Sequence, residues 1–484
     1  MIQIICKSEA YTYNTYHMMK AFYPSEEISC QTEEKASNYV TVKLPKEQKE
    51  EVLQIKEEQI CATADEREKK YQIDIQLYDL LKEKTGRELA WGILTGVRPT
   101  KIAMQELETG RKEEDFIPWF TEEFRVRKDK AYLAWEIANR EKQLLDRLDY
   151  EEGYSLYVGI PFCPTVCTYC SFSSGSLEAW KHRVEDYLEA LCRELRFIAE
   201  RSGEKKLNTI YIGGGTPTTL NADQLECLLS CIDTNFSREY LLEYTVEAGR
   251  PDSITEEKLQ VIKRHQVTRI SINPQSMQQK TLDVIGRKHT VEQIREAYVL
   301  ARNVGFDNIN MDIIAGLPGE DIRDMEDTLE QITALHPDSL TVHSLAIKRA
   351  ARMEMKDLSA DAGQMNETLS GMIEAAQKAA KKMELYPYYL YRQKNIAGNF
   401  ENVGYAKVDK AGIYNILIME EKQSIIAAGA GASTKLVLKD PVPVPGSKKK
   451  KTTRLIRVEN VKAIDAYIAR IDEMIERKGE WLWH

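Results

Sequence analysis

The chain has 484 residues, of which 43% are hydrophobic and 30% are charged, a composition typical of a folded protein of about three domains. Acidic residues outnumber basic ones by 76 to 67, and the net charge of -9 argues against a general nucleic-acid binder. No apolar run approaches the roughly 18 to 20 residues of a membrane helix, and the N-terminus lacks a signal-peptide pattern. We therefore expect a cytoplasmic protein with no membrane span and no nucleic-acid partner.

Residues 1–150 are predicted to form a small α+β accessory domain. Apolar and polar residues alternate as in strands over Met1–Lys7 and Tyr39–Leu44. Residues that favour helices dominate three segments, namely Tyr11–Phe22, Glu47–Glu58 and Glu66–Lys84. This part of the chain has no obvious catalytic cluster.

Residues 151–350 show a regular alternation of short β-rich runs and helical segments. The runs are Leu156–Ile160, Thr209–Ile212, Glu243–Val246, Arg269–Ile272, Asn308–Ile314 and Ser339–His343. Such alternation implies parallel β-α units with right-handed crossovers. Six units are too few for a closed eight-stranded barrel, so they predict an open partial barrel or a doubly wound sheet. In either architecture the chemistry belongs at the carboxyl ends of the strands.

Residues 351–484 are predicted to form a C-terminal α+β domain that covers the mouth of the barrel. An alanine- and lysine-rich helix is expected over Asn366–Met383, followed by the aromatic run Tyr386–Arg392. A strand pair is expected around Ile413–Met419 and Ser433–Leu438.

The strongest signal is the clustering of three of the nine cysteines in Pro161-Phe-Cys163-Pro-Thr-Val-Cys167-Thr-Tyr-Cys170, just after the first strand of the β-α series. An odd, uneven set of cysteines in a long chain is not a disulfide framework. Three thiolates on one loop can hold three irons of a [4Fe-4S] cluster and leave the fourth iron open to a small molecule. The alternative is a zinc site with His182 as the fourth ligand, although this spacing is unusual for zinc knuckles.

Polar or glycine residues also stand at the ends of the next four predicted strands. The second strand is followed by Gly213-Gly-Gly-Thr216-Pro217, whose glycines allow a backbone to approach a ligand closely. Glu247 ends the third strand, Gln275 follows the fourth, and Asp312 lies on the fifth. Each of these residues alone could be structural. Their recurrence at one end of the sheet predicts a binding site.

The motif C-x3-C-x-aromatic-C, with Tyr169 as the aromatic residue, resembles the signature of the radical S-adenosylmethionine (SAM) superfamily. The resemblance covers at least residues 154–350 and implies a (β/α)6 partial TIM barrel. It implies that Cys163, Cys167 and Cys170 bind a [4Fe-4S] cluster whose open iron chelates SAM. It also implies that the reduced cluster cleaves SAM to a 5′-deoxyadenosyl radical that abstracts hydrogen. The glycine turn resembles the GGGTP motif that contacts SAM.

Within the superfamily, four further segments resemble the oxygen-independent coproporphyrinogen III oxidase family, and especially its longer HemZ type. They begin at Tyr157, Ile272, Ile285 and Val342. The HemZ type is also resembled at Gly249-Arg-Pro251 and Arg392-Gln-Lys-Asn395. The resemblance gives Tyr157 a catalytic role and implies that SAM or its radical products are contacted by Tyr157, Gly214, Gly215, Thr216, Glu247, Gln275, Arg287, Asp312 and Ala346.

The resemblance implies oxidative decarboxylation of coproporphyrinogen III to protoporphyrinogen IX in haem biosynthesis, with electrons from a donor such as flavodoxin or ferredoxin. A tetrapyrrole with four propionates needs local cations in an acidic protein, and the candidates are Lys348, Arg349, Arg352, Arg392 and Lys394. Surface solvation is the alternative explanation of these cations. Two other functions stay open: a haem-binding chaperone, which Phe172 favours, and anaerobic radical degradation of haem. Gly159 replaces the histidine of the family pattern.

Overall fold

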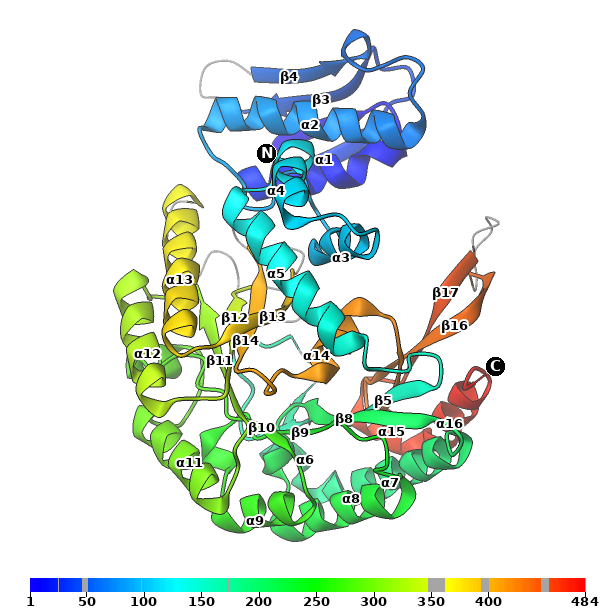
Figure 1. The fold of residues 1–484 in the computed structure, drawn as a ribbon, viewed down its shortest axis with the longest axis vertical. Coiled ribbons are helices and arrows are strands. Elements are labelled where there is room, and N and C mark those ends of the chain that lie inside the picture. Colours follow the sequence, from blue (N-terminus) through cyan, green and yellow to red (C-terminus); the bar gives the residue numbers. More distant parts are fainter. Residues whose placement is uncertain are drawn as a thin grey trace.

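The computed structural model describes residues 1–24, 26–45, 51–96, 98–171, 174–346, 362–392, 400–444 and 452–483. A small N-terminal α+β unit stands above a large α/β body, and the long helix α5 (Lys128–Leu145) runs from one toward the other (Figure 1). The helices α3 (Thr100–Glu108) and α4 (Glu113–Phe124) lie in the same connecting region. Buried residues of α3, α4 and α5 belong to the core of the large body.

The N-terminal unit has its own hydrophobic core under a four-stranded sheet in the order β2-β1-β3-β4. Its elements are β1 (Ile2–Cys6), α1 (Glu9–Phe22), β2 (Ile28–Thr32), β3 (Asn38–Leu44), β4 (Glu51–Lys56) and α2 (Glu66–Thr85). The predicted helix Glu47–Glu58 is wrong, because Glu51–Lys56 pairs antiparallel with β3 at the edge of the sheet. Strand pairing there overrides the helix preference of glutamate and lysine. Residues 46–50 lie outside the described part of the chain.

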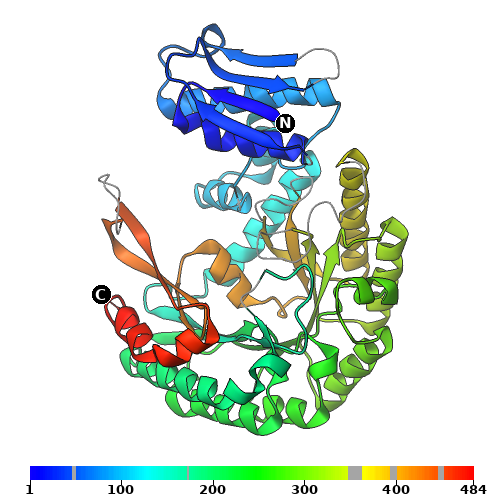
Figure 2. The same ribbon diagram turned by 180° about the vertical axis from the view of Figure 1, so that it is seen from behind.

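The six predicted strands of the β-α series are confirmed, and they are parallel neighbours in chain order. They are β5 (Gly153–Ile160), β8 (Lys206–Gly214), β9 (Glu243–Glu247), β10 (Arg269–Ser271), β11 (Ile309–Ala315) and β12 (Ser339–Ser344). The helices α7 (Val184–Arg201), α8 (Ala222–Asn235), α9 (Glu256–Arg264), α11 (Val291–Val304) and α12 (Ile322–Leu335) form an outer ring around them (Figures 1 and 2). In the described residues β5 and β12 do not pair, so the barrel stays open.

The C-terminal part extends this sheet at both edges to eleven strands. Beyond β12 lie β14 (Asn402–Ala406), antiparallel to it, and β13 (Tyr386–Tyr391). Beyond β5 lie β15 (Ser424–Ala428), parallel to it, and then β16 (Ser433–Pro443) and β17 (Thr452–Glu459). The predicted helix is α13 (Ala362–Lys382), which packs on α12. Two short helices, α15 (Ile464–Ala469) and α16 (Ile471–Gly479), pack on α7.

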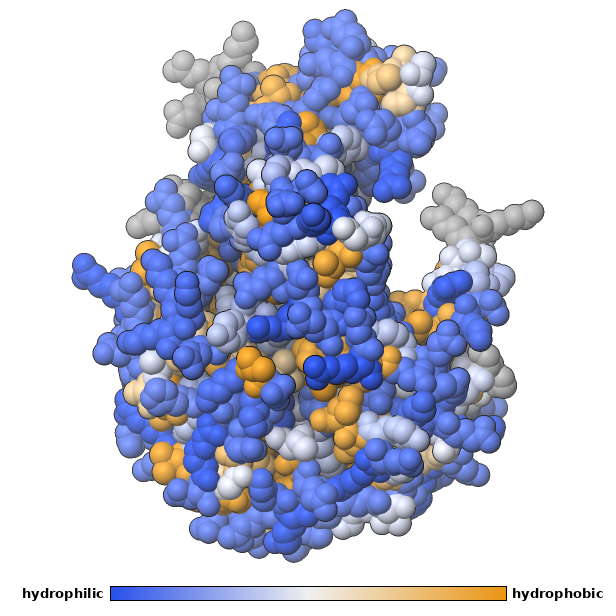
Figure 3. All heavy atoms as spheres, in the orientation of Figure 1, coloured by the Kyte–Doolittle hydropathy of each residue, from blue (hydrophilic) through white to orange (hydrophobic). Residues whose placement is uncertain are grey.

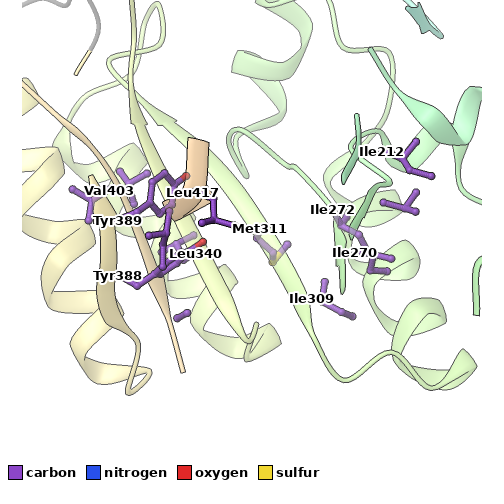
Figure 4. Packing of buried hydrophobic residues seen from close by; sticks show 14 of the residues in the cluster. Ile212, Ile270, Ile272, Ile309, Met311, Leu340, Tyr388, Tyr389, Val403 and Leu417 are labelled. Carbon is purple, nitrogen blue, oxygen red and sulfur yellow. The ribbon is translucent and has the colours of Figure 1, made fainter. Parts of the chain in front are cut away.

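The predicted strand Ile413–Met419 is wrong, because this segment is the helix α14 (Ile413–Glu420). Its residues are apolar on nearly all sides, so no periodicity in the sequence separates a buried helix from a buried strand. The buried carboxylate of Glu243 accepts hydrogen bonds from the backbone N–H groups of Ile413 and Tyr414 and so satisfies the first turn of the helix. The helix packs against β8 and β13, and Figure 4 shows Leu417 near Met311 and Leu340 of the sheet.

The main core is one continuous set of buried residues that runs from the outer helices through the sheet to α14 and the C-terminal helices. The face in Figure 3 is mostly hydrophilic, with apolar residues in small separate patches. None of the described helices is long and apolar enough to cross a membrane. Short segments that connect the main elements include β6 (Phe162–Cys163), β7 (Gly175–Ser176), α6 (Leu177–Trp180) and α10 (Gln279–Val284).

Candidate functional site

The three clustered cysteines lie on the segment that follows β5, which we call the cysteine loop (residues 161–171). Cys167 is buried, whereas Cys163 and Cys170 are half-buried. Burial raises the pKa of the Cys163 thiol, and the neighbouring Cys167 and Cys170 raise it further. The Cys170 N–H donates to the Cys167 carbonyl oxygen at 3.2 Å, so the loop folds back tightly and keeps its three thiols at the carboxyl end of the sheet.

The loop fits an iron-sulfur cube better than a single metal ion. Among the described residues, no three histidine, cysteine or acidic side chains converge closely enough to hold one ion, and His182 is exposed. The zinc arrangement is therefore not formed. A cube distributes three thiolates over three separate irons and does not require them to meet at one point.

Arg250, directly after β9, anchors the cysteine loop. Its guanidinium donates to the Thr165 carbonyl oxygen at 3.2 Å and to Thr165 Oγ1 at 3.1 Å, and it lies 3.7 Å from Cys167 Sγ. Asp252 holds the other side of the guanidinium through two hydrogen bonds of 2.9 and 2.8 Å. The sequence pointed to Arg250 only as part of the Gly249-Arg-Pro251 segment that resembles the HemZ type, and it gave this arginine no role of its own.

The glycine turn after β8 packs directly on the start of the cysteine loop. The N–H of Gly215 donates to the Ile160 carbonyl and that of Thr216 to the Phe162 carbonyl, both at 2.7 Å. A Cβ atom at Gly215 would lie 2.6 Å from the Phe162 oxygen, and Gly214 has a φ of +104°. Thr216 Oγ1 donates to Cys163 Sγ at 3.6 Å. Only glycine fits this close approach.

Glu247, at the end of β9, forms a hydrogen-bonded pair with Tyr211 of β8, which we call the acidic centre. The Tyr211 hydroxyl donates to Glu247 Oε1 at 2.5 Å. Tyr211 stacks on Tyr414 of α14 with ring centroids 4.5 Å apart, and Tyr157 stacks beside both rings at 6.3 Å. Burial raises the pKa of Tyr157. The sequence pointed to Tyr157 and Glu247 but not to Tyr211 or Tyr414, whose rings meet only because α14 packs inside the sheet.

Asp312 on β11 belongs to a second polar row. Its Oδ1 accepts from Asn310 at 2.6 Å, and its Oδ2 lies 3.7 Å from His343 Nε2 of β12. The opposite ring nitrogen of His343 lies 3.3 Å from the Tyr391 hydroxyl. The pKa of Asp312 is lowered despite burial, chiefly by His343. The sequence placed His343 in a segment that resembles the family and Tyr391 in an aromatic run suited to a pyrrole, but it did not predict that they contact each other or that His343 lies beside Asp312.

Gln275 is held in an unusual backbone conformation between β10 and β11. Its φ is +68°, its N–H donates to the Asp312 carbonyl at 2.9 Å, and its carbonyl accepts from the Ile314 N–H at 2.9 Å. A non-glycine residue at positive φ is strained and is typical of functional sites. Its buried side-chain oxygen Oε1 has no hydrogen-bond partner among the described residues.

Arg287 is buried beneath the cysteine loop. It donates to the Asn273 carbonyl oxygen and, at 3.5 Å, to the Tyr169 hydroxyl, while its Nε has no partner among the described residues. A buried polar atom without a hydrogen bond destabilises the folded protein unless a bound ligand supplies the missing partner. Gln275 Oε1 and Arg287 Nε therefore fit a polar cofactor such as SAM beside the loop.

The remaining predicted residues make none of the contacts described above or lie outside the described part of the chain. Ala346 is half-buried against the main core just beyond β12. Arg392 is buried and donates to the Leu94 carbonyl at 2.7 Å, and burial lowers its pKa to about 10. Phe172, Lys348, Arg349, Arg352 and Lys394 lie outside the described residues.

Comparisons with known proteins agree with this arrangement. The family model described as "Radical SAM superfamily" matches residues 157–332. The oxygen-independent coproporphyrinogen-III oxidase-like protein HemZ of Bacillus subtilis (strain 168) is 41% identical over 409 residues, which cover 84% of this chain and 79% of HemZ. The heme chaperone HemW of the same organism is 35% identical over 40% of this chain and 51% of its own length.

The fold is similar to that of the Escherichia coli coproporphyrinogen III oxidase HemN, described as a radical SAM enzyme. The TM-score is 0.53 at 21% identity, and the match covers 72% of this chain and 73% of the HemN chain. The family implies a [4Fe-4S] cluster and SAM as cofactors. The chain belongs to the radical SAM superfamily and, within it, to the family of the coproporphyrinogen-III oxidase-like protein HemZ.

Proposed function

We propose that the protein catalyses the oxygen-independent oxidative decarboxylation of coproporphyrinogen III to protoporphyrinogen IX. Each of two propionates would lose a β-hydrogen atom, carbon dioxide and one electron, and a vinyl group would form. The observation that carries the proposal is the meeting of the cysteine loop, the glycine turn and Gln275 at one end of the sheet. These three parts of the site come together in a chain that is 41% identical to HemZ over most of its length.

Cys163, Cys167 and Cys170 would hold the cluster, and Arg250 would keep the loop in place through its hydrogen bonds to Thr165. When bound and reduced, the cluster and SAM supply hydrogen-atom abstraction, the difficult step of the reaction. The backbone of the glycine turn would lie against SAM without side-chain obstruction. Gln275 Oε1 would accept a hydrogen bond from the cofactor and Arg287 Nε would donate one, because neither atom has a partner among the described residues.

The acidic centre and the second polar row would orient the ligands. Asp312, whose pKa is lowered, offers a fixed carboxylate to hydroxyl or ammonium groups. Burial raises the pKa of Glu247 to about 7, so this carboxyl group can donate or accept a hydrogen bond near neutral pH. The stacked rings of Tyr157, Tyr211 and Tyr414 offer flat amphipathic surface suited to a pyrrole.

The test is anaerobic incubation of the reconstituted protein with SAM, coproporphyrinogen III, an electron acceptor and a reductant such as flavodoxin or ferredoxin. We expect vinyl-containing product, carbon dioxide and cleaved SAM to appear together. The Cys167→Ala variant serves as the cluster-free control and should give none of the three. Cleavage of SAM without a vinyl product would reject the substrate and leave a radical SAM enzyme.

The similarity to HemW supports a second candidate, a haem chaperone, because it covers 40% of the chain. A chaperone would bind haem stoichiometrically and would release it unchanged to an acceptor protein. Haem titration monitored at the Soret band distinguishes the two functions. Tight binding of one haem without vinyl product from coproporphyrinogen III would favour the chaperone.

A further inference from the structure

Three cysteines that take no part in the site described above gather between two neighbouring outer helices. Cys192 lies on α7, and Cys227 and Cys231 lie one turn apart on α8. The Cys231 thiol donates to the Cys192 carbonyl oxygen at 4.0 Å, so the two residues are in contact across the pair of helices. Cys192 is buried, Cys231 is half-buried and Cys227 is exposed.

The surroundings of the two thiols are unequal. Cys231 receives the hydrogen bond of Cys192 and lies near the cation Arg196, and these contacts lower its pKa to about 7. Asn235 Nδ2 also lies 3.9 Å from its sulfur. The pKa of Cys192 is raised by its hydrogen bond with Cys231 and by burial. The half-exposed Cys231 is thus the better nucleophile, with the buried Cys192 in contact to resolve a mixed disulfide.

We propose that Cys192 and Cys231 form a reversible disulfide between α7 and α8, in exchange with a small-molecule disulfide. The Cys231 thiolate would attack one sulfur of the small disulfide and displace the other half as a thiolate. Cys192 would lose its proton to solvent, attack the Cys231 sulfur and displace the second half. The protein dithiol loses two electrons, and the small disulfide gains them as two thiols.

The bond would tie together the two helices that follow the parts of the cofactor site. The α7 helix follows the cysteine loop, and its Tyr187 donates to the Gly159 carbonyl at the end of β5 at 2.7 Å. The α8 helix follows the glycine turn. A bond between Cys227 and Cys231 would join two turns of the same helix and would tie nothing together.

The chain contains a matched control pair in its N-terminal unit. Cys6 of β1 and Cys30 of β2 are likewise neighbours on two paired strands, but burial raises the pKa of Cys6 to about 12 and also raises that of Cys30. Neither thiol of this pair has a lowered pKa. If proximity of two thiols were enough for oxidation, both pairs would form disulfides at the same rate. The proposed exchange starts from a thiolate and therefore favours the pair that contains Cys231. Cys61, which is exposed and distant, reports general reaction with the oxidant.

The test exposes the anaerobically reconstituted protein to oxidised glutathione, blocks remaining thiols with N-ethylmaleimide and maps disulfide-linked peptides by mass spectrometry. We expect the Cys192–Cys231 peptide to appear about tenfold sooner than any Cys6–Cys30 peptide and to vanish when reduced glutathione is added. Cys231→Ser and Cys192→Ser should abolish it, and Cys227→Ser should leave it. Wild-type protein whose Cys61 is glutathionylated while Cys192 and Cys231 stay unlinked would overturn the proposal, as would a linked peptide that reduced glutathione cannot reverse.

Discussion

Tyr211 donates its phenolic hydrogen to Oε1 of Glu247 at 2.5 Å, across the adjacent parallel strands β8 and β9. Gly213 makes room for this contact, because a Cβ atom there would lie 3.0 Å from the Glu247 carboxyl carbon. Burial raises the pKa of Glu247, and Asp312 adds to this effect, while the Tyr211 hydrogen bond and His343 oppose it; the net result is a pKa of about 7 instead of 4.5. The carboxyl group therefore changes charge near neutral pH at the centre of the site.

We expect Glu247 to make the folded protein less stable as the pH rises through about 7. The folded pKa lies above the unfolded one, so this residue's contribution to stability is complete below about pH 4.5 and lost by the time the pH exceeds 7. Glu247→Gln should therefore lose less Tm between pH 6 and pH 8 than the wild type. The exposed Glu256→Gln variant should keep the wild-type difference, and an unchanged difference in Glu247→Gln would contradict the assignment.

Gly215→Ala should damage the glycine turn. The added methyl group would lie 2.6 Å from the Phe162 oxygen and 2.9 Å from the Ile160 oxygen, both backbone atoms that cannot move freely. We expect a loss of roughly 2 to 4 kcal/mol of unfolding free energy, together with weaker SAM binding. Gly203→Ala is the control, because its nearest neighbour would be at 3.9 Å. Urea unfolding and equilibrium dialysis of SAM measure the two effects, and equal behaviour of both variants would refute the steric argument.

The sequence was sufficient to predict the barrel strands and the cofactor motif, because both depend on local pattern. The C-x3-C-x2-C spacing needs only one loop, and the six β-rich runs each carry their own apolar signal. The residues at successive strand ends could be grouped because parallel strands in chain order bring their carboxyl ends to one edge. This reasoning predicted that Glu247, Gln275 and Asp312 share that edge, and the structure places them there.

The parts that could not be predicted depend on contacts between distant segments. The apolar segment Ile413–Met419 predicts a strand as readily as a helix, and its packing against β8 and β13 together with the Glu243 cap makes it the helix α14. Arg250, Tyr211 and His343 acquire their partners through tertiary packing. Glu51–Lys56 is a strand only because β3 offers it an edge.

Arg250→Lys should weaken retention of the iron-sulfur cluster. Lysine keeps the positive charge but lacks the planar guanidinium. The guanidinium donates two hydrogen bonds to Thr165 and, from its other edge, donates to the Asp252 carboxylate. We expect iron and sulfide content after reconstitution to fall several-fold, with the far-UV spectrum unchanged. The exposed Arg264→Lys variant, whose partner is Glu226, should keep full iron content. Full cluster occupancy in Arg250→Lys would show that the loop does not need this anchor.

We expect one buried ion pair between the C-terminal helix α16 and the barrel helix α7 to contribute strongly to the stability of the folded protein. Lys478 of α16 donates to Glu194 of α7 at 2.5 Å, and both side chains are at most 1% exposed. Glu194 also accepts from the Tyr467 hydroxyl at 2.6 Å, from Asn460 at 2.8 Å and from the Gly429 N–H at 2.9 Å. The carboxylate thus accepts from four residues of the C-terminal part, all of them more than 200 positions away in the chain.

Removing the cation alone leaves a buried charge that other donors compensate only in part, so Lys478→Met should lower the unfolding free energy by about 3 to 5 kcal/mol. The double variant Glu194→Gln/Lys478→Met should recover part of this loss, because no buried charge remains. Arg470→Met breaks an exposed pair with Glu473 on the same helical segment and should cost less than about 1 kcal/mol. Urea unfolding followed by tryptophan fluorescence gives all three values. If Lys478→Met were no worse than Arg470→Met, the C-terminal helix would be attached by apolar packing alone, and the buried pair would serve only to fix its register against α7.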